Sequence, residues 1–225
     1  MLTWIVSVVE GLALWLLAIA PGVVVSVLVA KATGGNVAAC AFAAQACYLA
    51  SVVLVIASLF GGRYGDFGFA VDYHYTLLAV LVSTLVSLPL GLGLSRITRG
   101  EPEPPFLPER PAHRAVLMFA LAPASEEAVF RGLVEGFLLQ HVDPCTAVAV
   151  PAVLFALGHL IPYSYSKRMA AAVSASALIL GLVAGHFRMV SGSLLPAIAS
   201  HAVFNAVGYH ISKRDKSGSA VITSL

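Results

Sequence analysis

Residues 126–135 read Glu126-Glu127-Ala128-Val129-Phe130-Arg131-Gly132-Leu133-Val134-Glu135. They lie within an apolar segment, about Pro111–Gln140, that is long enough to cross a membrane as a helix. An ionised side chain near the bilayer centre costs roughly 2.5–3.5 kcal/mol on insertion scales. Three carboxylates and a guanidinium so close together must therefore face a protein interior or a water-filled cavity. The segment is the first place to look for chemistry.

The composition of the whole chain predicts an integral membrane protein. Of its 225 residues, 59% are hydrophobic and 11% are charged, whereas a soluble domain carries about 25% charged residues. The apolar segments predict an all-α transmembrane bundle of seven or eight helices around a polar intramembrane cavity. Seven can be marked: about Trp4–Ala30, Val37–Phe60, Tyr75–Leu94, Pro111–Gln140, Pro144–Ile161, Met169–Val190 and Ser193–Ile211.

A polar, proline-rich loop, Glu101–Pro108, divides the predicted transmembrane domain, residues 1–225. The front part, residues 1–99, holds three helices, and the back part, residues 111–211, holds four and all the candidate chemistry.

The distribution of basic residues predicts the orientation, because cytoplasmic loops collect lysine and arginine. With the N-terminus outside, Arg63 and Arg188 fall on the outer side and ten basic residues fall on the cytoplasmic side. We therefore predict an N-terminus outside and a C-terminus in the cytoplasm. The expected location is the inner membrane of a prokaryotic cell. The ten are Lys31, Arg96, Arg99, Arg110, Arg114, Lys167, Arg168, Lys213, Arg214 and Lys216.

Glu127, Arg131 and Glu135 follow one another at intervals of four residues, so they share one helix face. Arg131 can pair with both carboxylates, which makes buried charges tolerable. Glu126 is rotated by about 100° from Glu127, lies outside this ladder and needs another partner. A carboxylate without a close cation in a poorly solvated site is suited to general acid–base work. We therefore assign Glu127 to a structural ion pair and Glu126 to the reaction, with a polar knot between helices as the structural alternative.

Two histidines and an asparagine lie in helices predicted to surround the glutamates. His159 follows Phe155 by four residues near the end of the fifth span, and His201 and Asn205 are four apart in the seventh. One histidine in an apolar helix is more often a satisfied core residue than a catalyst. Two, with an amide and a carboxylate, can activate water and stabilise an oxyanion.

Other chemistries remain open from the residues alone. Glu126, His159 and His201 could bind zinc, although no H-E-x-x-H pair is present. Ser125 and Ser200 have no recognisable nucleophile elbow. A non-catalytic membrane scaffold or regulatory partner, or a transporter, would also place ionisable residues in the spans. A mechanism in which a carboxylate and one histidine activate water, while the second histidine and the asparagine hold the oxyanion, uses Glu126, His159, His201 and Asn205 together.

At these residues the chain resembles the CPBP membrane proteins, a family of CAAX proteases and bacteriocin-processing enzymes also called Abi. Each of its motifs alone is weak, but the ordered set across about Pro111–Tyr209 is specific. The matches are Glu126-Glu127-Ala-Val-Phe-Arg131 to E-E-x-x-x-R, Phe155-Ala-Leu-Gly-His159 to F-x-x-x-H, and His201-Ala-Val-Phe-Asn205 to H-x-x-x-N.

The resemblance implies an intramembrane glutamic endopeptidase that works without a metal or another cofactor. Carried over by motif position, Glu126 and His159 would activate water, and His201 and Asn205 would form the oxyanion hole. The supporting residues would be Glu127, Arg131 and Phe155. The implied partners are the lipid bilayer and a membrane-anchored protein or peptide, lipidated in some members, cut near its C-terminus. No nucleic acid is expected.

Overall fold

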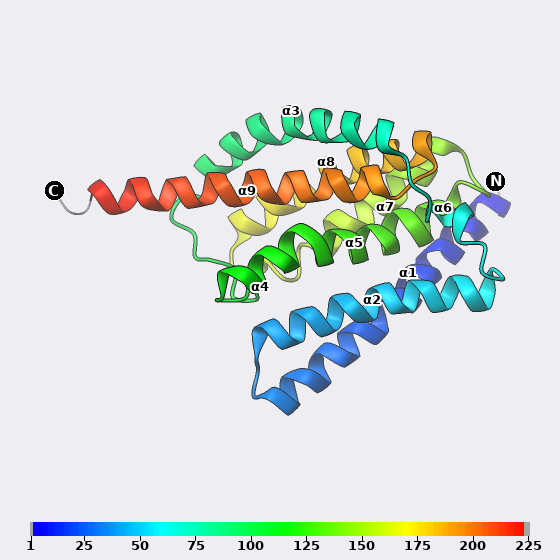
Figure 1. Ribbon diagram of the computed structural model, residues 1–225, viewed down its shortest axis with the longest axis horizontal. Helices are drawn as coiled ribbons and strands as arrows, with labels where there is room; N and C mark the ends of the chain where they lie inside the picture. Colours follow the sequence, from blue (N-terminus) through cyan, green and yellow to red (C-terminus); the bar gives the residue numbers. More distant parts are fainter. Residues whose placement is uncertain (1, 223–225) are drawn as a thin grey trace.

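The computed structural model describes residues 2–222, and this part of the chain is an all-helical bundle without β-strands (Figure 1). The predicted fold class is confirmed, although whether a polar cavity lies within the membrane stays a prediction. Within the described residues, six predicted segments correspond to single helices. These are α1 (Leu2–Thr33), α2 (Val37–Leu59), α3 (Tyr73–Ile97), α7 (Pro144–Gly158), α8 (Lys167–Ser191) and α9 (Leu195–Ile222).

The fourth predicted segment is a continuous rod in which α-helical and wider π-helical turns alternate. We call residues 111–138 the α4–α6 segment. Such π-helical turns are rare and occur frequently at functional sites. In chain order the rod consists of α4 (Pro111–Val116), η2 (Leu117–Leu121, π-helical), α5 (Ala122–Glu127), η3 (Ala128–Glu135, π-helical) and α6 (Gly136–Leu138).

Side-chain caps explain where several helices begin. Asn36 accepts a hydrogen bond from the backbone N–H of Ala39 at the start of α2, at 3.0 Å. Asp72, Asp143 and Ser166 cap α3, α7 and α8 in the same way. Each satisfies a backbone donor that has no partner within the helix. At the other end of α8, Gly192 takes a positive φ of 67°, a conformation that glycine adopts without steric cost.

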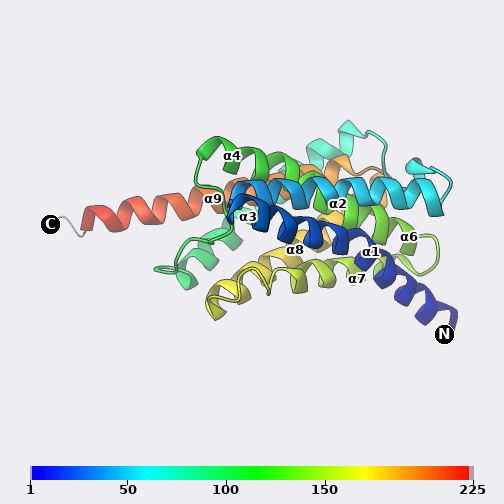
Figure 2. The same ribbon diagram turned by 90° about the horizontal axis from the view of Figure 1, so that it is seen from below.

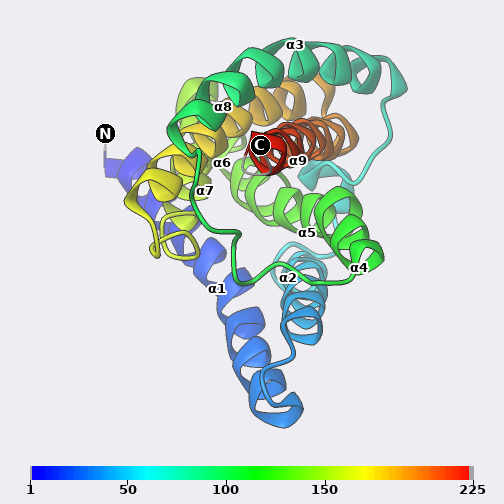
Figure 3. The ribbon, with the colours of Figure 1, turned by 90° about the vertical axis from the view of Figure 1, so that its left-hand side faces the viewer.

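α9 lies in the middle of the bundle, with α3, α8 and the α4–α6 segment around it (Figure 3). α1 and α2 pack against each other and extend away from the other helices as an arm. α1 crosses α2 obliquely (Figure 2), and both contact η3 of the α4–α6 segment. The three helices of the front part therefore do not form one unit. α3 packs on α9 and α8, whereas α1 and α2 pack on η3 and α5.

Four helices, α1, α2, α3 and α8, are long and apolar enough to cross a membrane. α7 is apolar but has only 15 residues. Large apolar side chains such as Leu16, Leu54 and Leu77 are exposed along α1, α2 and α3, and contiguous apolar surface of this kind suits contact with lipid. These features are those of an integral membrane protein.

The connections alternate between two ends of the bundle (Figure 1). The α1–α2, α3–α4 and α7–α8 connections lie at the end where α9 finishes, and the α2–α3, α6–α7 and α8–α9 connections lie at the N-terminal end. Which end faces the cytoplasm stays a prediction from the charges. Arg214 and Lys216, which are predicted to be cytoplasmic, are not among the residues whose side chains the structure describes.

Arg188, predicted at the outer membrane edge, is instead buried, with 4% of its surface exposed. The 3-10 turn η1 (Tyr64–Phe67) folds over the end of α8, and Arg188 Nη2 donates a hydrogen bond to the Asp66 carbonyl at 2.9 Å. Gly68 has a positive φ of 83°, and a Cβ atom there would collide with the Arg188 side chain. The sequence pattern of α8 alone cannot indicate that another segment covers this residue.

Candidate active site

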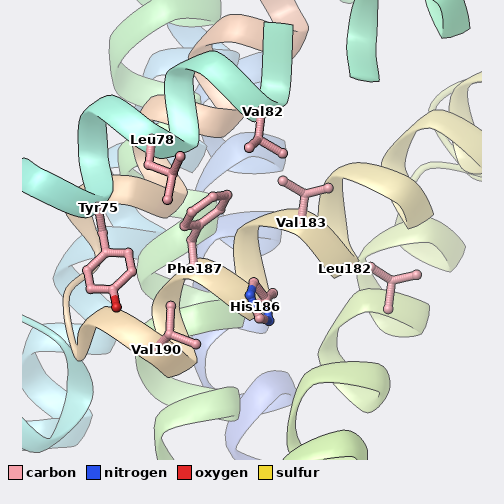
Figure 4. Close-up of a pocket in the computed structure, with 8 residues that line it drawn as sticks. All are labelled: Tyr75, Leu78, Val82, Leu182, Val183, His186, Phe187 and Val190. Atoms are coloured by element: carbon pink, nitrogen blue, oxygen red, sulfur yellow. The ribbon is translucent and has the colours of Figure 1, made fainter. Parts of the chain in front are cut away.

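An apolar groove between α3 and α8 holds none of the predicted site residues (Figure 4). Its volume is about 560 Å³, and Phe187 lies in the middle of the labelled side chains. The only polar groups among its lining side chains, all within the described chain, belong to Tyr75 and His186. The groove therefore lacks the cluster of groups that the motifs predict.

Glu127 and Arg131 form a fully buried ion pair. Arg131 Nε lies 3.2 Å from Glu127 Oε2, and Nη1 lies 3.4 Å from Oε1. The Arg131 guanidinium also lies over the Phe155 ring, 4.7 Å from its centroid, a favourable cation–π geometry. The predicted pairing of these two residues is confirmed, and Phe155 contacts the pair as a neighbour.

The predicted pairing of Arg131 with Glu135 is not observed. Glu135 is fully buried, and among the described residues neither of its carboxylate oxygens has a hydrogen-bond partner. The guanidinium is directed instead to Glu127 and Phe155. Two glycines of α8 leave room for the charged side chains: a Cβ at Gly185 would lie 2.8 Å from Glu135 Oε2, and one at Gly181 would lie 3.0 Å from Arg131 Nη2.

His201 connects the two adjacent glutamates. Its Nδ1 lies 2.8 Å from Glu127 Oε1, and its Nε2 lies 3.9 Å from Glu126 Oε2. A carboxylate at this distance from Nδ1 favours the tautomer in which Nδ1 carries the hydrogen. The buried ring is therefore oriented so that Nε2 faces Glu126.

Glu126 points away from the Arg131 pair, as the rotation between neighbouring helical residues predicts. Its side chain is 20% exposed. Its hydrogen-bond partner is Gln45 on α2, whose Nε2 donates to Glu126 Oε1 at 2.8 Å. The other oxygen, Oε2, is the one that faces His201. The reactive carboxylate assigned from sequence thus has a neutral donor on one side and an imidazole on the other.

His159 caps the end of α7, where the helix was predicted to stop. Its Nδ1 lies 2.8 Å from the Phe155 carbonyl, so Nδ1–H donates to the backbone. In the neutral ring, Nε2 is then the nitrogen that can accept a hydrogen bond. The His159 and His201 rings both contact the Phe155 ring edge-to-face, with centroid distances of 4.6 and 5.5 Å. Between the described side chains of His159 and Glu126 there is neither a hydrogen bond nor an ion pair.

Tyr163 packs against His159 at the end of α7. Its ring stacks on His159 with centroids 6.4 Å apart. Burial is the main cause that raises the pKa of the Tyr163 hydroxyl.

Asn205 is held by a backbone carbonyl that the irregular helix leaves free. In the π-helical turn η2, the Ala122 N–H donates to Leu117 O. The next amide in that register belongs to Pro123, which has no N–H, so the Met118 carbonyl lacks this donor. Asn205 Nδ2 donates to that carbonyl at 2.8 Å. This contact fixes one amide hydrogen of Asn205 and leaves the second available.

A cavity of about 630 Å³ brings several predicted residues together. Its lining includes Phe155, His159, His201 and Asn205, along with residues of α3, α8 and the α3–α4 connection. Glu126 is not among the lining residues, all of which belong to the described chain, and it reaches the cavity wall through His201.

The α3–α4 connection forms the outer wall of this cavity and is attached to neighbouring segments. Arg114 of α4 lies 3.5 Å from Glu103 and donates to the Pro108 carbonyl at 3.0 Å. The Phe106 ring contacts Tyr163 edge-to-face at 5.1 Å. The proline-rich loop predicted as a divider between two parts therefore also encloses the site.

Sequence reasoning missed Gln45, Tyr163 and the role of Pro123. The available signals were a glutamine inside an apolar span and a proline inside the fourth span. The structure also bears on the zinc alternative: within the described residues, no group of three or more His, Cys, Asp and Glu side chains could hold a metal ion.

The fold and the site define a polytopic membrane protein with a buried cluster of carboxylates and imidazoles beside a cavity. The family model described as type II CAAX prenyl endopeptidase Rce1-like matches residues 108–207, which carry all three motifs. This match, over less than half of the chain, agrees with the resemblance to the CPBP proteins that the motifs indicate. At the level of the family, this match supports a membrane endopeptidase of the CAAX protease type. No curated protein and no solved structure matches the chain.

Proposed function

We propose that the chain is an intramembrane endopeptidase that hydrolyses a peptide bond near the C-terminus of a membrane-anchored protein or peptide. One observation carries the proposal: Glu126 Oε2 lies 3.9 Å from His201 Nε2, and the His201 ring lines a cavity shared with His159 and Asn205. Two imidazoles and an amide thus border one space, and the Glu126 carboxylate lies behind this wall, facing His201.

In the proposed reaction, a water molecule near Glu126 and His159 loses a proton to the carboxylate and attacks the scissile carbonyl carbon. A C–O bond forms, and the carbonyl oxygen becomes an oxyanion. His159 orients the water through its free Nε2. When the C–N bond breaks, the proton held by Glu126 passes to the leaving amine, so that a carboxylic acid and an amine result.

The oxyanion is stabilised by donors on one face of α9. Asn205 keeps one amide hydrogen after donating the other to Met118. His201, when protonated, donates from Nε2, and its Nδ1–H is held by Glu127 at 2.8 Å. Donors fixed in place before the reaction stabilise developing charge at no reorganisation cost. The Glu127–Arg131 pair keeps the imidazole in this orientation.

The site favours a substrate that is already at the membrane, because such a substrate arrives by lateral diffusion. The cavity is bordered by apolar side chains of α3, α8 and α9, including Leu94, Val173 and Phe204, and by the polar α3–α4 connection. This combination suits a tail with a lipidated or apolar part and a polar peptide end. A prenylated C-terminal tail is the substrate class that the family description suggests.

Glu126→Gln tests the mechanism. The purified protein in proteoliposomes is incubated with a farnesylated peptide that ends in a CAAX-type tail, and products are measured by mass spectrometry. We expect wild-type protein to release the shortened peptide and Glu126→Gln to lose at least about 10³-fold in rate, since the amide cannot take a proton. Glu10→Gln on the exposed face of α1 is the matched control and should retain full activity.

Activity of Glu126→Gln at the wild-type rate would reject the proposed mechanism. A chelator arm addresses the zinc alternative: loss of activity that added zinc restores would favour a metalloprotease. If no peptide is cleaved but a partner protein still binds both forms, the scaffold alternative gains support.

A further inference from the structure

We propose that Gln45 on α2 is a positioning residue for Glu126, which it holds so that one carboxylate oxygen faces His201. The inference rests on the proposed function. Gln45 lies outside residues 108–207, the segment that the family model matches. It belongs to the arm formed by α1 and α2, to which the sequence assigned no chemistry.

The contacts of Gln45 fix the orientation of its amide. Nε2 donates to Glu126 Oε1 at 2.8 Å, and Oε1 accepts a hydrogen bond from the Ser125 hydroxyl. An ionised carboxylate only accepts hydrogen bonds, so the NH₂ group of the amide must face Glu126. The amide oxygen is then left for Ser125, which is fully buried. Adjacent residues of α5 therefore bind both ends of one side chain from α2.

Gln45 carries no charge, so it can orient Glu126 without pairing with it as a cation would. A lysine or arginine at this position would pair with Glu126, as Arg131 pairs with Glu127, and would make the carboxylate a weaker base. An apolar residue would leave Oε1 without a donor and the carboxylate free to rotate. The amide gives direction without a counter-charge, and it leaves Oε2 facing His201 Nε2 at 3.9 Å.

The position of α2 shows how the arm reaches the site. α2 contacts α5 and η3 directly, and Gln45 and Glu126 are 81 residues apart in the sequence. Gln45 is half-buried, while the remainder of its helix is apolar apart from small hydroxyl and thiol side chains and Tyr48. A glutamine in such a helix costs free energy unless its amide is satisfied, and the partners that satisfy it are at the candidate active site.

The test compares Gln45→Met with wild type in the proteoliposome peptide assay. Methionine keeps the length of the side chain and removes the donor. We expect kcat to fall about tenfold, the size of one lost hydrogen bond, with KM changed less than about twofold. The acid side of the kcat–pH profile should move to higher pH, because the carboxylate anion loses a hydrogen-bond donor that favours it.

Gln45→Glu is a second variant of nearly the same shape. It places another carboxylate beside Glu126 and should move the acid side of the profile further in the same direction, because like charges disfavour double ionisation. Gln140→Met is the matched control, since Gln140 donates to the Gly136 carbonyl at 2.8 Å, outside the site. Its kcat and pH profile should equal those of wild type.

Wild-type kcat and pH profile in Gln45→Met, alongside an inactive Glu126→Gln, would overturn this inference and leave the proposed function standing. A lower kcat with an unshifted profile in both Gln45 variants would also overturn it, because packing alone would then explain the loss. If Glu126→Gln is fully active, the proposed function itself fails. Should Gln45→Met not fold, the profile of Gln45→Glu decides.

Discussion

Two glutamates that are neighbours in the chain have opposite surroundings. Glu127 is fully buried and receives the Arg131 guanidinium and the His201 Nδ1–H. Glu126 is 20% exposed and receives a neutral amide. The rotation of about 100° between adjacent helical residues sends the two side chains to different neighbours. The same residue type thus serves as an anchor in one position and as the proposed base in the next.

Arg131→Met should show how much the anchor contributes to stability. The change leaves a buried carboxylate without its cation, which costs about 3–5 kcal/mol in comparable sites. We expect a fall of that order in the free energy of unfolding, measured by denaturant unfolding in detergent micelles. Replacing both partners, Glu127→Gln with Arg131→Met, should recover most of the loss.

The control for this experiment is an exposed pair of the same type. Arg63 lies 3.3 Å from Asp66, with both side chains well exposed, and exposed pairs contribute about 0–1 kcal/mol. Arg63→Met should therefore change stability little. An equal loss in Arg63→Met and Arg131→Met would contradict the assignment of Glu127–Arg131 as the buried anchor.

At the scale of elements, the irregular turns of the α4–α6 segment make one backbone carbonyl available to a neighbouring helix. A regular α-helix would use the Met118 carbonyl within its own hydrogen-bond ladder. The π-helical register of η2 and the missing N–H of Pro123 leave that carbonyl to Asn205 of α9. The four-residue spacing correctly predicted that Glu127 meets Arg131, because neighbouring turns bring such residues together in either type of helix. It could not predict the register change.

Pro123→Ala tests this dependence. The alanine N–H would compete with Asn205 Nδ2 for the Met118 carbonyl, so the amide would lose its fixed position. We expect kcat in the peptide assay to fall about tenfold, less than the 10²–10³ lost when an oxyanion-hole donor is removed. Thermal stability should stay the same or rise, because the helix gains a hydrogen bond.

Pro89→Ala in α3 is the matched control, because Pro89 also lies inside a helix but is exposed and away from the site. It should leave kcat unchanged. A wild-type kcat in Pro123→Ala would mean that the free carbonyl does not position Asn205.

At the scale of the whole molecule, the sequence predicted what local patterns determine. The start of α2 follows from Asn36, which caps it, and the seven predicted apolar segments match the helical segments of the described chain. Gln45 and Arg188 were missed because their partners, Glu126 and Asp66, are 81 and 122 residues away. Spacing along one helix indicates which residues share a face, but it does not indicate which helix covers that face.

Arg188 is buried, so Arg63 is the one exposed basic residue counted for the outer side, and the orientation stays a prediction. The α3–α4 connection, part of the cavity wall, lies at the end where α9 finishes. If the basic residues face the cytoplasm, substrate tails enter from the cytoplasmic side. Arg63→Cys and Lys167→Cys, each exposed and each at an opposite end of the bundle, can test this in a background without Cys40, Cys47 and Cys145.

We expect a membrane-impermeant maleimide to label Arg63→Cys in intact cells and to label Lys167→Cys only after the membrane is permeabilised. We expect this pattern because the excess of basic residues in cytoplasmic loops sets the orientation of a membrane protein. The cysteine-free background, which should not react, measures non-specific labelling. The reverse pattern would place the cavity mouth on the outer side, so that the substrate tail would have to be presented from outside the cell.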